Sequence, residues 1–199
     1  DFENYYSTMS FEAEAQIVRE LGKFLLDGSL NQGFKPVFWS TVEKTALADA
    51  EVEYMDHTSN TIYAAFKVKE TNQDFLKDAS AVIWTTTPWT IPANKALAFN
   101  SSIEYSVIEI SELNYFKEKK IIVATNLIDS ITKACEIENY KILKTFKGKE
   151  LSGTICSHPF IKMDFSYDVP MLDAQFVNLE QGTGIVHCAP SHGPDDFNL

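Results

Sequence analysis

The sequence has few of the features that mark membrane, secreted or fibrous proteins. It contains no apolar run of the roughly 20 residues that cross a bilayer as a helix. Its first residues, Asp1-Phe2-Glu3-Asn4, have neither the basic nor the apolar region of a signal peptide. Glycine and proline are also sparse, at 8 and 7 residues, so collagenous and low-complexity chains are excluded. We expect no membrane association.

Cysteine is scarce as well. The three residues, Cys135, Cys156 and Cys188, are odd in number and widely spaced. This usage is typical of free thiols in a reducing compartment and not of a disulfide framework. The sequence therefore predicts a cytoplasmic protein.

Positive charge is limited, and Arg19 is the one arginine among the 17 basic residues. The net charge is -11, so the surface as a whole should repel a phosphate backbone. Any contact with RNA must be local, or must borrow its affinity from another part of a larger assembly.

What is present fits an ordinary folded domain. The 199 residues are 45% hydrophobic and 23% charged, which is close to the average of globular proteins. We predict one domain over residues 1–199, monomeric in isolation. Because the chain begins without Met and stops at Leu199 directly after a dense polar cluster, we expect a fragment cut from a longer protein.

Helical spacing of apolar residues appears first, over Phe11 to Leu26, with Ser10 as N-cap and Gly28 as stop. A second helix is predicted over Asn126 to Ile137, and a hairpin over Glu51 to Val68. Short β-rich runs fill most of the remainder, at residues 37–39, 81–84, 105–110, 121–124, 140–145, 171–172 and 184–188. This pattern predicts a mixed α/β, β-rich domain with a curved or barrel-like sheet and a few flanking helices.

The first segment that carries chemistry is WTTTPWTIPAN, residues 84–94, which follows an apolar strand. Pro88 and Pro92 remove backbone donors and bias the residues before them to extended conformations, so we expect a stiff, irregular loop. Threonine hydroxyls both donate and accept hydrogen bonds, which suits them to hold a water and a carbonyl oxygen. A threonine-rich strand with core tryptophans explains the composition equally well.

The second segment is GTGIVHCAPSHGPDDF, residues 182–197. Its glycines permit unusual backbone angles, a short strand delivers His187 to a cleft, and a helical turn starting near Pro194 presents Asp195 or Asp196. It lacks the lysine of a phosphate-binding loop. A catalytic metal is disfavoured because His187 and Cys188 point to opposite faces of a strand and no zinc spacing appears. A Cys188 nucleophile paired with His192 is disfavoured for want of an orienting third group.

Together the two segments closely resemble the editing domain, the connective peptide 1 insertion, of isoleucyl-tRNA synthetases. A third matching stretch comprises KPVFWS at residues 35–40 and TALADAEVEY at residues 45–54. Leucyl and valyl relatives carry arginine within the threonine-proline motif, whereas Thr87 stands before Pro88 here. The resemblance implies hydrolysis of valyl-tRNA, and of valyl-adenylate as a further substrate, formed in error by isoleucine-tRNA ligase.

The resemblance also implies roles for individual residues. Asp196 would bind the α-ammonium of the substrate, and His187 would select the side chain. Thr85, Thr86 and Thr87 would hold the ester and its attacking water. The remaining substrate-binding positions are Trp84, Trp89 and Thr90 around the side chain, and Asn94 near the terminal adenosine.

The expected partners are the valine-carrying 3′ end of isoleucine tRNA and the remainder of the synthetase chain. Editing should need no cofactor and no metal, since ATP and Mg²⁺ would serve the synthetic domain. Two alternatives stay open: a tRNA-binding or interaction module without turnover, and a metal-dependent hydrolase. Asp195 is equally well explained as a helix cap, and we expect His57 and His158 to be surface residues.

Overall fold

The computed structural model describes residues 3, 5–111 and 118–199. The chain divides into two compact units, residues 1–35 and 36–199. The sequence predicted one domain over residues 1–199, and all strands and the residues of both motifs lie in the second unit.

The first unit contains the predicted amphipathic helix, α1 (Phe11–Leu26). Ser10 caps it through a hydrogen bond from the Ala13 amide to the serine hydroxyl, 3.3 Å long. Gly28, with φ of 84°, follows the last turn, as the sequence predicted. Ala13 is the one buried apolar residue described in this unit, so most of the apolar face of α1 is exposed.

Eleven strands are described in the second unit. β1 (Phe38–Ser40) and β2 (Thr45–Leu47) form an antiparallel pair. The other nine are β3 (Ile62–Glu70), β4 (Ser80–Thr85), β5 (Ala96–Phe99), β6 (Glu104–Ile110), β7 (Lys120–Ala124), β8 (Tyr140–Lys147), β9 (Ile155–Ser157), β10 (Asp168–Asp173) and β11 (Val186–Cys188). They make one sheet in the order β11-β5-β10-β9-β3-β4-β7-β6-β8.

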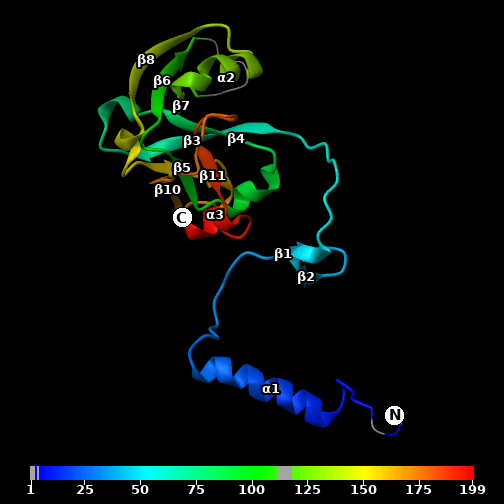
Figure 1. The fold of residues 1–199 in the computed structure, drawn as a ribbon. Helices are drawn as coiled ribbons and strands as arrows, with labels where there is room; N and C mark the ends of the chain where they lie inside the picture. The colour runs from blue at the N-terminus through cyan, green and yellow to red at the C-terminus, as the bar shows by residue number, and fades with distance from the viewer. Residues whose placement is uncertain (1–2, 4, 112–117) are drawn as a thin grey trace. The chain divides into compact units, whose positions relative to one another are not determined.

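This sheet is mostly antiparallel, with parallel pairing of β10 to β5 and of β4 to β7. Its two outer strands in that order, β11 and β8, are not paired with each other among the described residues, so the sheet is not a closed barrel. β11 nevertheless lies against β4, which is five strands away in the order, so the sheet bends back on itself (Figure 1). The predicted mixed α/β, β-rich class with a curved sheet is confirmed, and closure is not.

Helices flank the sheet in short pieces. The second predicted helix is present but shorter, as α2 (Ile128–Ala134), and the helical turn near Pro194 is α3 (Pro194–Asn198). Six 3₁₀ turns are described: η1 (Asp49–Glu51), η2 (Asp74–Leu76), η3 (Pro88–Ala93), η4 (Thr125–Leu127), η5 (Gly148–Leu151) and η6 (Ile161–Met163). No helix of the described residues is long and apolar enough to cross a membrane.

The predicted hairpin over Glu51 to Val68 is wrong. β3 pairs with β4 along Ile62 to Lys67 and with β9 at Val68 and Glu70, and residues 52–54 belong to no strand. Those residues lie in an extended stretch that is largely exposed. Only the second half of the predicted hairpin, Ile62 to Val68, forms a strand, as part of β3.

The core lies on the sheet and beneath α2. Its largest fully buried side chains are Tyr105, Phe66, Phe99, Leu76, Ile83, Ile91, Leu97, Ile108, Ile110, Ile121, Ile122 and Ile131. A second, smaller cluster joins β5 to β11 through Ala96, Ala98 and Cys188. β11 is therefore anchored by burial as well as by pairing, which fixes the strand that carries His187.

Candidate functional site

A cleft of about 470 Å³ brings the two sequence motifs together. One wall comes from the end of β4 and from η3, and the other from β11 and the turn into α3. The lining residues are Trp84, Thr85, Thr86, Thr87, Trp89, Thr90, Val186, His187, Ala189, His192 and Asp196. Segments separated by about 100 residues thus form one concave site.

The threonine segment is held by its own hydroxyls. The Thr87 amide donates to Thr85 Oγ1 at 3.0 Å, and the two threonine hydroxyls lie 3.2 Å apart. The Ser59 hydroxyl donates to the carbonyl of Thr86 at 3.2 Å. The sequence predicted an irregular loop after Pro88, and the structure shows a 3₁₀ turn there, η3. The segment that was expected to be a stiff, irregular loop therefore has a regular backbone over Pro88–Ala93.

His187 is held at both ring nitrogens. Asn94 donates from Nδ2 to His187 Nδ1 at 2.8 Å and to the carbonyl of Ala96 at 2.9 Å. Because Nδ1 accepts, the proton of the neutral ring sits on Nε2, which donates to Thr90 Oγ1 at 2.9 Å. The Thr90 hydroxyl in turn donates to the carbonyl of Thr87 at 2.8 Å. Each donor in this series of hydrogen bonds, from Asn94 through His187 to Thr90, therefore has an acceptor.

This arrangement keeps His187 uncharged. Burial, together with smaller effects of the nearby His158 and His192, lowers the pKa of His187 from 6.5 to about 4. A proton on Nδ1 would also face the amide hydrogens of Asn94. The cleft therefore presents a neutral, immobile imidazole at neutral pH.

The structure distinguishes between the two adjacent carboxylates. Asp196 lines the cleft, and its Oδ2 accepts the amide of Ala189 at 2.8 Å. Asp195 is exposed and does not belong to the lining. Burial raises the pKa of Asp196, and the Ala189 amide partly opposes that rise. A cationic group in the cleft would compensate the burial of this carboxylate.

The glycines before β11 have the backbone roles that the sequence suggested. Gly184 has φ of 76°, and a Cβ on it would lie 2.4 Å from Cβ of Ala124. Gly182 has φ of 82°, and a Cβ there would lie 3.6 Å from the Trp84 indole. Gly184 therefore allows the chain to pass close to β7 before it enters the cleft.

Most of the residues singled out from the sequence line the cleft, with one exception. Asn94 is wholly buried and contacts His187 instead of the open space. Because its side chain is buried, Asn94 is not placed to contact a terminal adenosine, which differs from the expected role. Its Oδ1 has no hydrogen-bond partner. Sequence reasoning did not single out Val186 or Ala189 as lining residues, and it gave His192 no substrate role.

Cys188 does not line the cleft, although its thiol interacts with the carboxylate of Asp196 behind the lining. It is buried in the small cluster against β5 and is absent from the lining. Burial raises the pKa of its thiol to about 12, so the thiolate that a nucleophile requires is strongly disfavoured. Cys135, Cys156 and Cys188 are all free thiols, as predicted.

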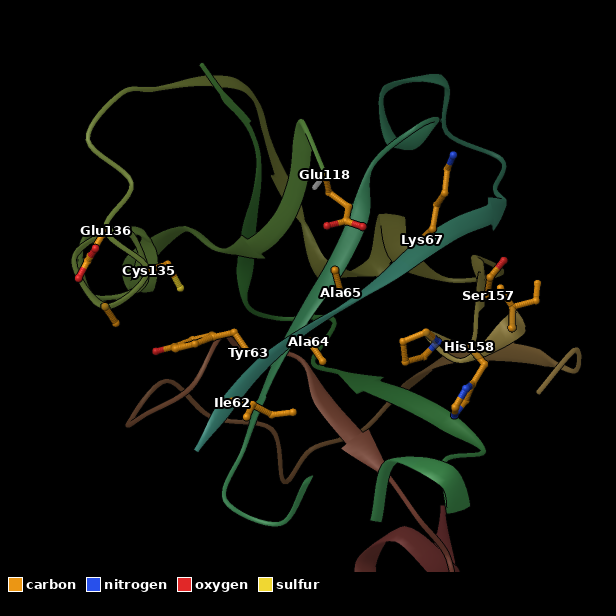
Figure 2. A pocket seen from close by; sticks show the side chains of 13 residues that line it. Ile62, Tyr63, Ala64, Ala65, Lys67, Glu118, Cys135, Glu136, Ser157 and His158 are labelled. Atoms are coloured by element: carbon orange, nitrogen blue, oxygen red, sulfur yellow. The ribbon is translucent and has the colours of Figure 1, made fainter. Parts of the chain in front are cut away.

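A larger cavity of about 920 Å³ lies elsewhere, along β3 (Figure 2). Ser157 and His158 stand at one end of it, and Cys135 and Glu136 at the other. None of the motif residues lines this cavity. In the described part of the chain, no group of three or more His, Cys, Asp or Glu side chains is placed to hold a metal ion.

Comparison with known proteins gives this geometry a context. Residues 1–180 match the family described as tRNA synthetases class I (I, L, M and V). The whole chain is 67% identical to a segment of isoleucine--tRNA ligase from Pelagibacter ubique and 49% identical to one from Gluconobacter oxydans. It spans 22% and 21% of those proteins.

A solved structure shares the fold. The cytosolic leucyl-tRNA synthetase editing domain of P. knowlesi superposes with a TM-score of 0.52 at 14% identity, over 69% of this chain and 59% of that one. This likeness concerns the fold alone.

Proposed function

The chain belongs to the class I tRNA synthetases (I, L, M and V), and we propose that it is the editing domain of an isoleucine-tRNA ligase. Its reaction is hydrolysis of the ester that joins valine to isoleucine tRNA. The observation that carries the proposal is the cleft in which threonine hydroxyls, a neutral histidine and one carboxylate converge. The resemblance implied the individual roles of these residues, and their convergence in one cleft supports those roles.

The need for such a reaction follows from the small difference between the two amino acids. Isoleucine against valine is the familiar instance in which one methylene provides only about 1–3 kcal/mol of discrimination. A second, hydrolytic pocket then has to accept valine and exclude isoleucine by steric clash.

Asp196 binds the α-ammonium of the substrate in this proposal. The Ala189 amide donates to Oδ2 and the Cys188 thiol also interacts with the carboxylate, so the group is held in place and its charge is available to the ammonium. The ammonium is common to all aminoacyl esters, so this contact provides position and no selectivity. It also relieves the cost of burying Asp196, whose pKa is raised by that burial.

His187 provides the selectivity. Hydrogen bonds at both ring nitrogens hold the ring in one orientation, so it acts as a rigid wall for the amino-acid side chain. Because the ring is neutral, it does not repel the substrate ammonium. Trp84 and Thr90 complete the side-chain pocket beside it.

The threonines position the reacting groups. Thr86 and Thr87 are exposed to the cleft, and Thr85 organises them through the hydrogen bonds to Thr87. Their hydroxyls bind the ester carbonyl and a water molecule, and the water attacks the carbonyl carbon. Holding the two reactants in this geometry supplies much of the rate acceleration. No covalent enzyme intermediate is required.

The partners follow from charge and from size. With a net charge of -11, the chain has little general attraction for tRNA, so the remainder of the synthetase delivers the aminoacylated 3′ end. The chain spans about a fifth of its relatives, which is consistent with a division of labour in which ATP and Mg²⁺ serve another domain. A cytoplasmic location completes the proposal.

Deacylation of valyl-tRNA(Ile) tests the proposal directly. The 199-residue chain is incubated with valyl-tRNA(Ile) and with a short valylated CCA oligonucleotide, and ester release is followed. The expected result is valine release above the spontaneous rate on at least the short substrate. Binding of both substrates without release would favour the module without turnover. Activity that disappears with a chelator and returns with a metal would favour the metal-dependent hydrolase.

A further inference from the structure

His158 is a buried residue, contrary to the surface position expected from the sequence. Only 1% of it is exposed. The Phe160 amide donates to His158 Nδ1 at 3.1 Å, so the proton of the neutral ring is on Nε2. Nε2 then donates to the carbonyl of Ile91 at 2.9 Å. The ring thus connects the segment after β9 to the turn η3, which is 67 residues away in sequence.

An aromatic cluster fixes the His158 ring. Phe165 stacks on it with centroids 4.9 Å apart and planes 18° apart. Phe66, Phe160 and Tyr167 pack around it at centroid distances of 6.0, 5.5 and 5.3 Å. Burial among these rings lowers the pKa of His158, which keeps it neutral. The ring therefore has one orientation and one proton position.

The turn that His158 holds, η3, is also held by hydrogen bonds at its two ends. Pro88 and Pro92 carry no amide hydrogen. The amide of Thr90 donates to Thr87 and that of Asn94 donates to Ile91. Two side chains add support from outside the turn: His158 Nε2 donates to the carbonyl of Ile91, and the Tyr167 hydroxyl donates to the carbonyl of Asn94 at 2.6 Å. Both supports come from residues outside the cleft lining.

Ile91 follows Thr90, and Thr90 is the residue whose hydroxyl fixes His187. A connected path therefore runs from His158 to the Ile91 carbonyl, along the turn to Thr90, and across to the imidazole in the cleft. Moving the turn away from β11 would lengthen the Thr90 to His187 bond of 2.9 Å and free the imidazole to rotate.

We propose that His158 is a positioning residue for substrate selection, and that its hydrogen bond to Ile91 holds η3 so that Thr90 fixes His187. This inference rests on the proposed function. It assigns His158 no contact with substrate, and it predicts that loss of this one bond relaxes discrimination between valyl and isoleucyl esters more than it slows valyl hydrolysis.

Two conservative substitutions separate the two hydrogen bonds of the ring. In His158→Gln the side-chain NH₂ lies near the position of Nε2 and donates to Ile91. In His158→Asn the side-chain oxygen lies near the position of Nδ1 and accepts from Phe160, but its NH₂ does not reach Ile91. His158→Phe keeps the aromatic packing and loses both bonds. His57→Phe, at an exposed histidine, is the matched control.

The measurement is the ratio of kcat/KM for valyl-tRNA(Ile) to that for isoleucyl-tRNA(Ile), with thermal unfolding recorded for every variant. We expect His158→Phe and His158→Asn to lower the ratio by about tenfold, because both variants lose the buried hydrogen bond to Ile91. His158→Gln should stay within about threefold of the parent chain, and His57→Phe should equal it.

A second measurement tests the path. Thr90→Val removes the hydroxyl that fixes His187, so combining it with His158→Asn should lower the ratio no further than Thr90→Val alone. Equal ratios for His158→Gln and His158→Asn, or additive effects of His158→Asn and Thr90→Val, would overturn the positioning role. A parent chain that releases no valine would instead refute the proposed function, and this inference with it.

Discussion

Replacing Asp196 with asparagine separates the two roles that the structure gives this carboxylate. Oδ2 accepts the Ala189 amide at 2.8 Å, which is a structural contact, and the carboxylate carries negative charge at the lining of the cleft. An asparagine oxygen accepts the same amide, so Asp196→Asn should keep the turn. It removes the negative charge that the ammonium requires.

The magnitude follows from the chemistry of that contact. A hydrogen bond to a charged group contributes about 1.5–3 kcal/mol, and about 1.4 kcal/mol corresponds to a tenfold change. We therefore expect kcat/KM for valyl-tRNA(Ile) to fall by roughly 10- to 150-fold in Asp196→Asn. Because burial raises the pKa of Asp196, losing its charge should leave the free energy of unfolding unchanged or slightly higher.

Asp196→Ala provides the contrast. It removes the charge and also leaves the Ala189 amide without an acceptor, which costs about 1–3 kcal/mol of stability. Asp195→Asn is the matched control, since Asp195 is exposed and does not line the cleft, and its activity should equal that of the parent chain. Deacylation kinetics and urea unfolding measure both quantities. Full activity in Asp196→Asn, or its loss in Asp195→Asn, would refute the anchoring role.

Three further outcomes are expected. His187→Ala should allow isoleucyl-tRNA(Ile) to be hydrolysed, because the fixed ring that excludes the larger side chain is gone; unchanged selectivity in deacylation assays would contradict this. The folded pKa of His187, about 4, lies below its unfolded value of 6.5, so its contribution is complete above pH 6.5 and is lost as pH falls toward 4. After allowance for solvent at the cleft, the parent chain should lose about 2 kcal/mol more than His187→Gln over that range, and parallel urea-unfolding curves for the two proteins would argue against it. Gly184→Ala should destabilise the fold by more than about 2 kcal/mol, and by more than Gly182→Ala, because only the first places a Cβ against Ala124; equal unfolding free energies would show that the contact relaxes without cost.

The residues of the cleft could be predicted from the sequence because each wall is formed mainly by one continuous segment. Residue propensities predict such local patterns well. One wall is a strand followed by a turn that contains two prolines, and the other is a short strand preceded by glycines. Pairing of β5 with β11 then brings the two walls together. The resemblance supplied the roles, and the structure adds which oxygens and nitrogens each side chain uses.

Other features depend on partners that are distant in sequence. β5 is buried on both faces and rich in alanine, so it shows no alternation to mark it as a strand. β9 is only three residues long and gains its identity from pairing with β3 and β10. The false hairpin arose from the opposite situation: residues 52–54 have a plausible local pattern but form no strand, whereas β3 pairs with β4 and β9.

The histidines show the same limit at the level of single side chains. Nothing near His158 in sequence predicts a contact with Ile91, because that contact depends on how β9 and η3 are placed. The resemblance assigned Asn94 to the substrate. In the structure its side chain is buried and its amide donates to His187, a contact that depends on the placement of β11. Composition also gave no indication of which of Asp195 and Asp196 would face the cleft.

A structure of the chain with a non-hydrolysable valyl-adenosine analogue tests the central claim most directly. The account predicts that the analogue occupies the cleft between η3 and β11. Its ammonium should lie about 2.7–2.9 Å from the carboxylate of Asp196, and its side chain should pack against His187. Binding in the larger cavity along β3, or equally good binding of the isoleucyl analogue with an unmoved His187, would contradict it.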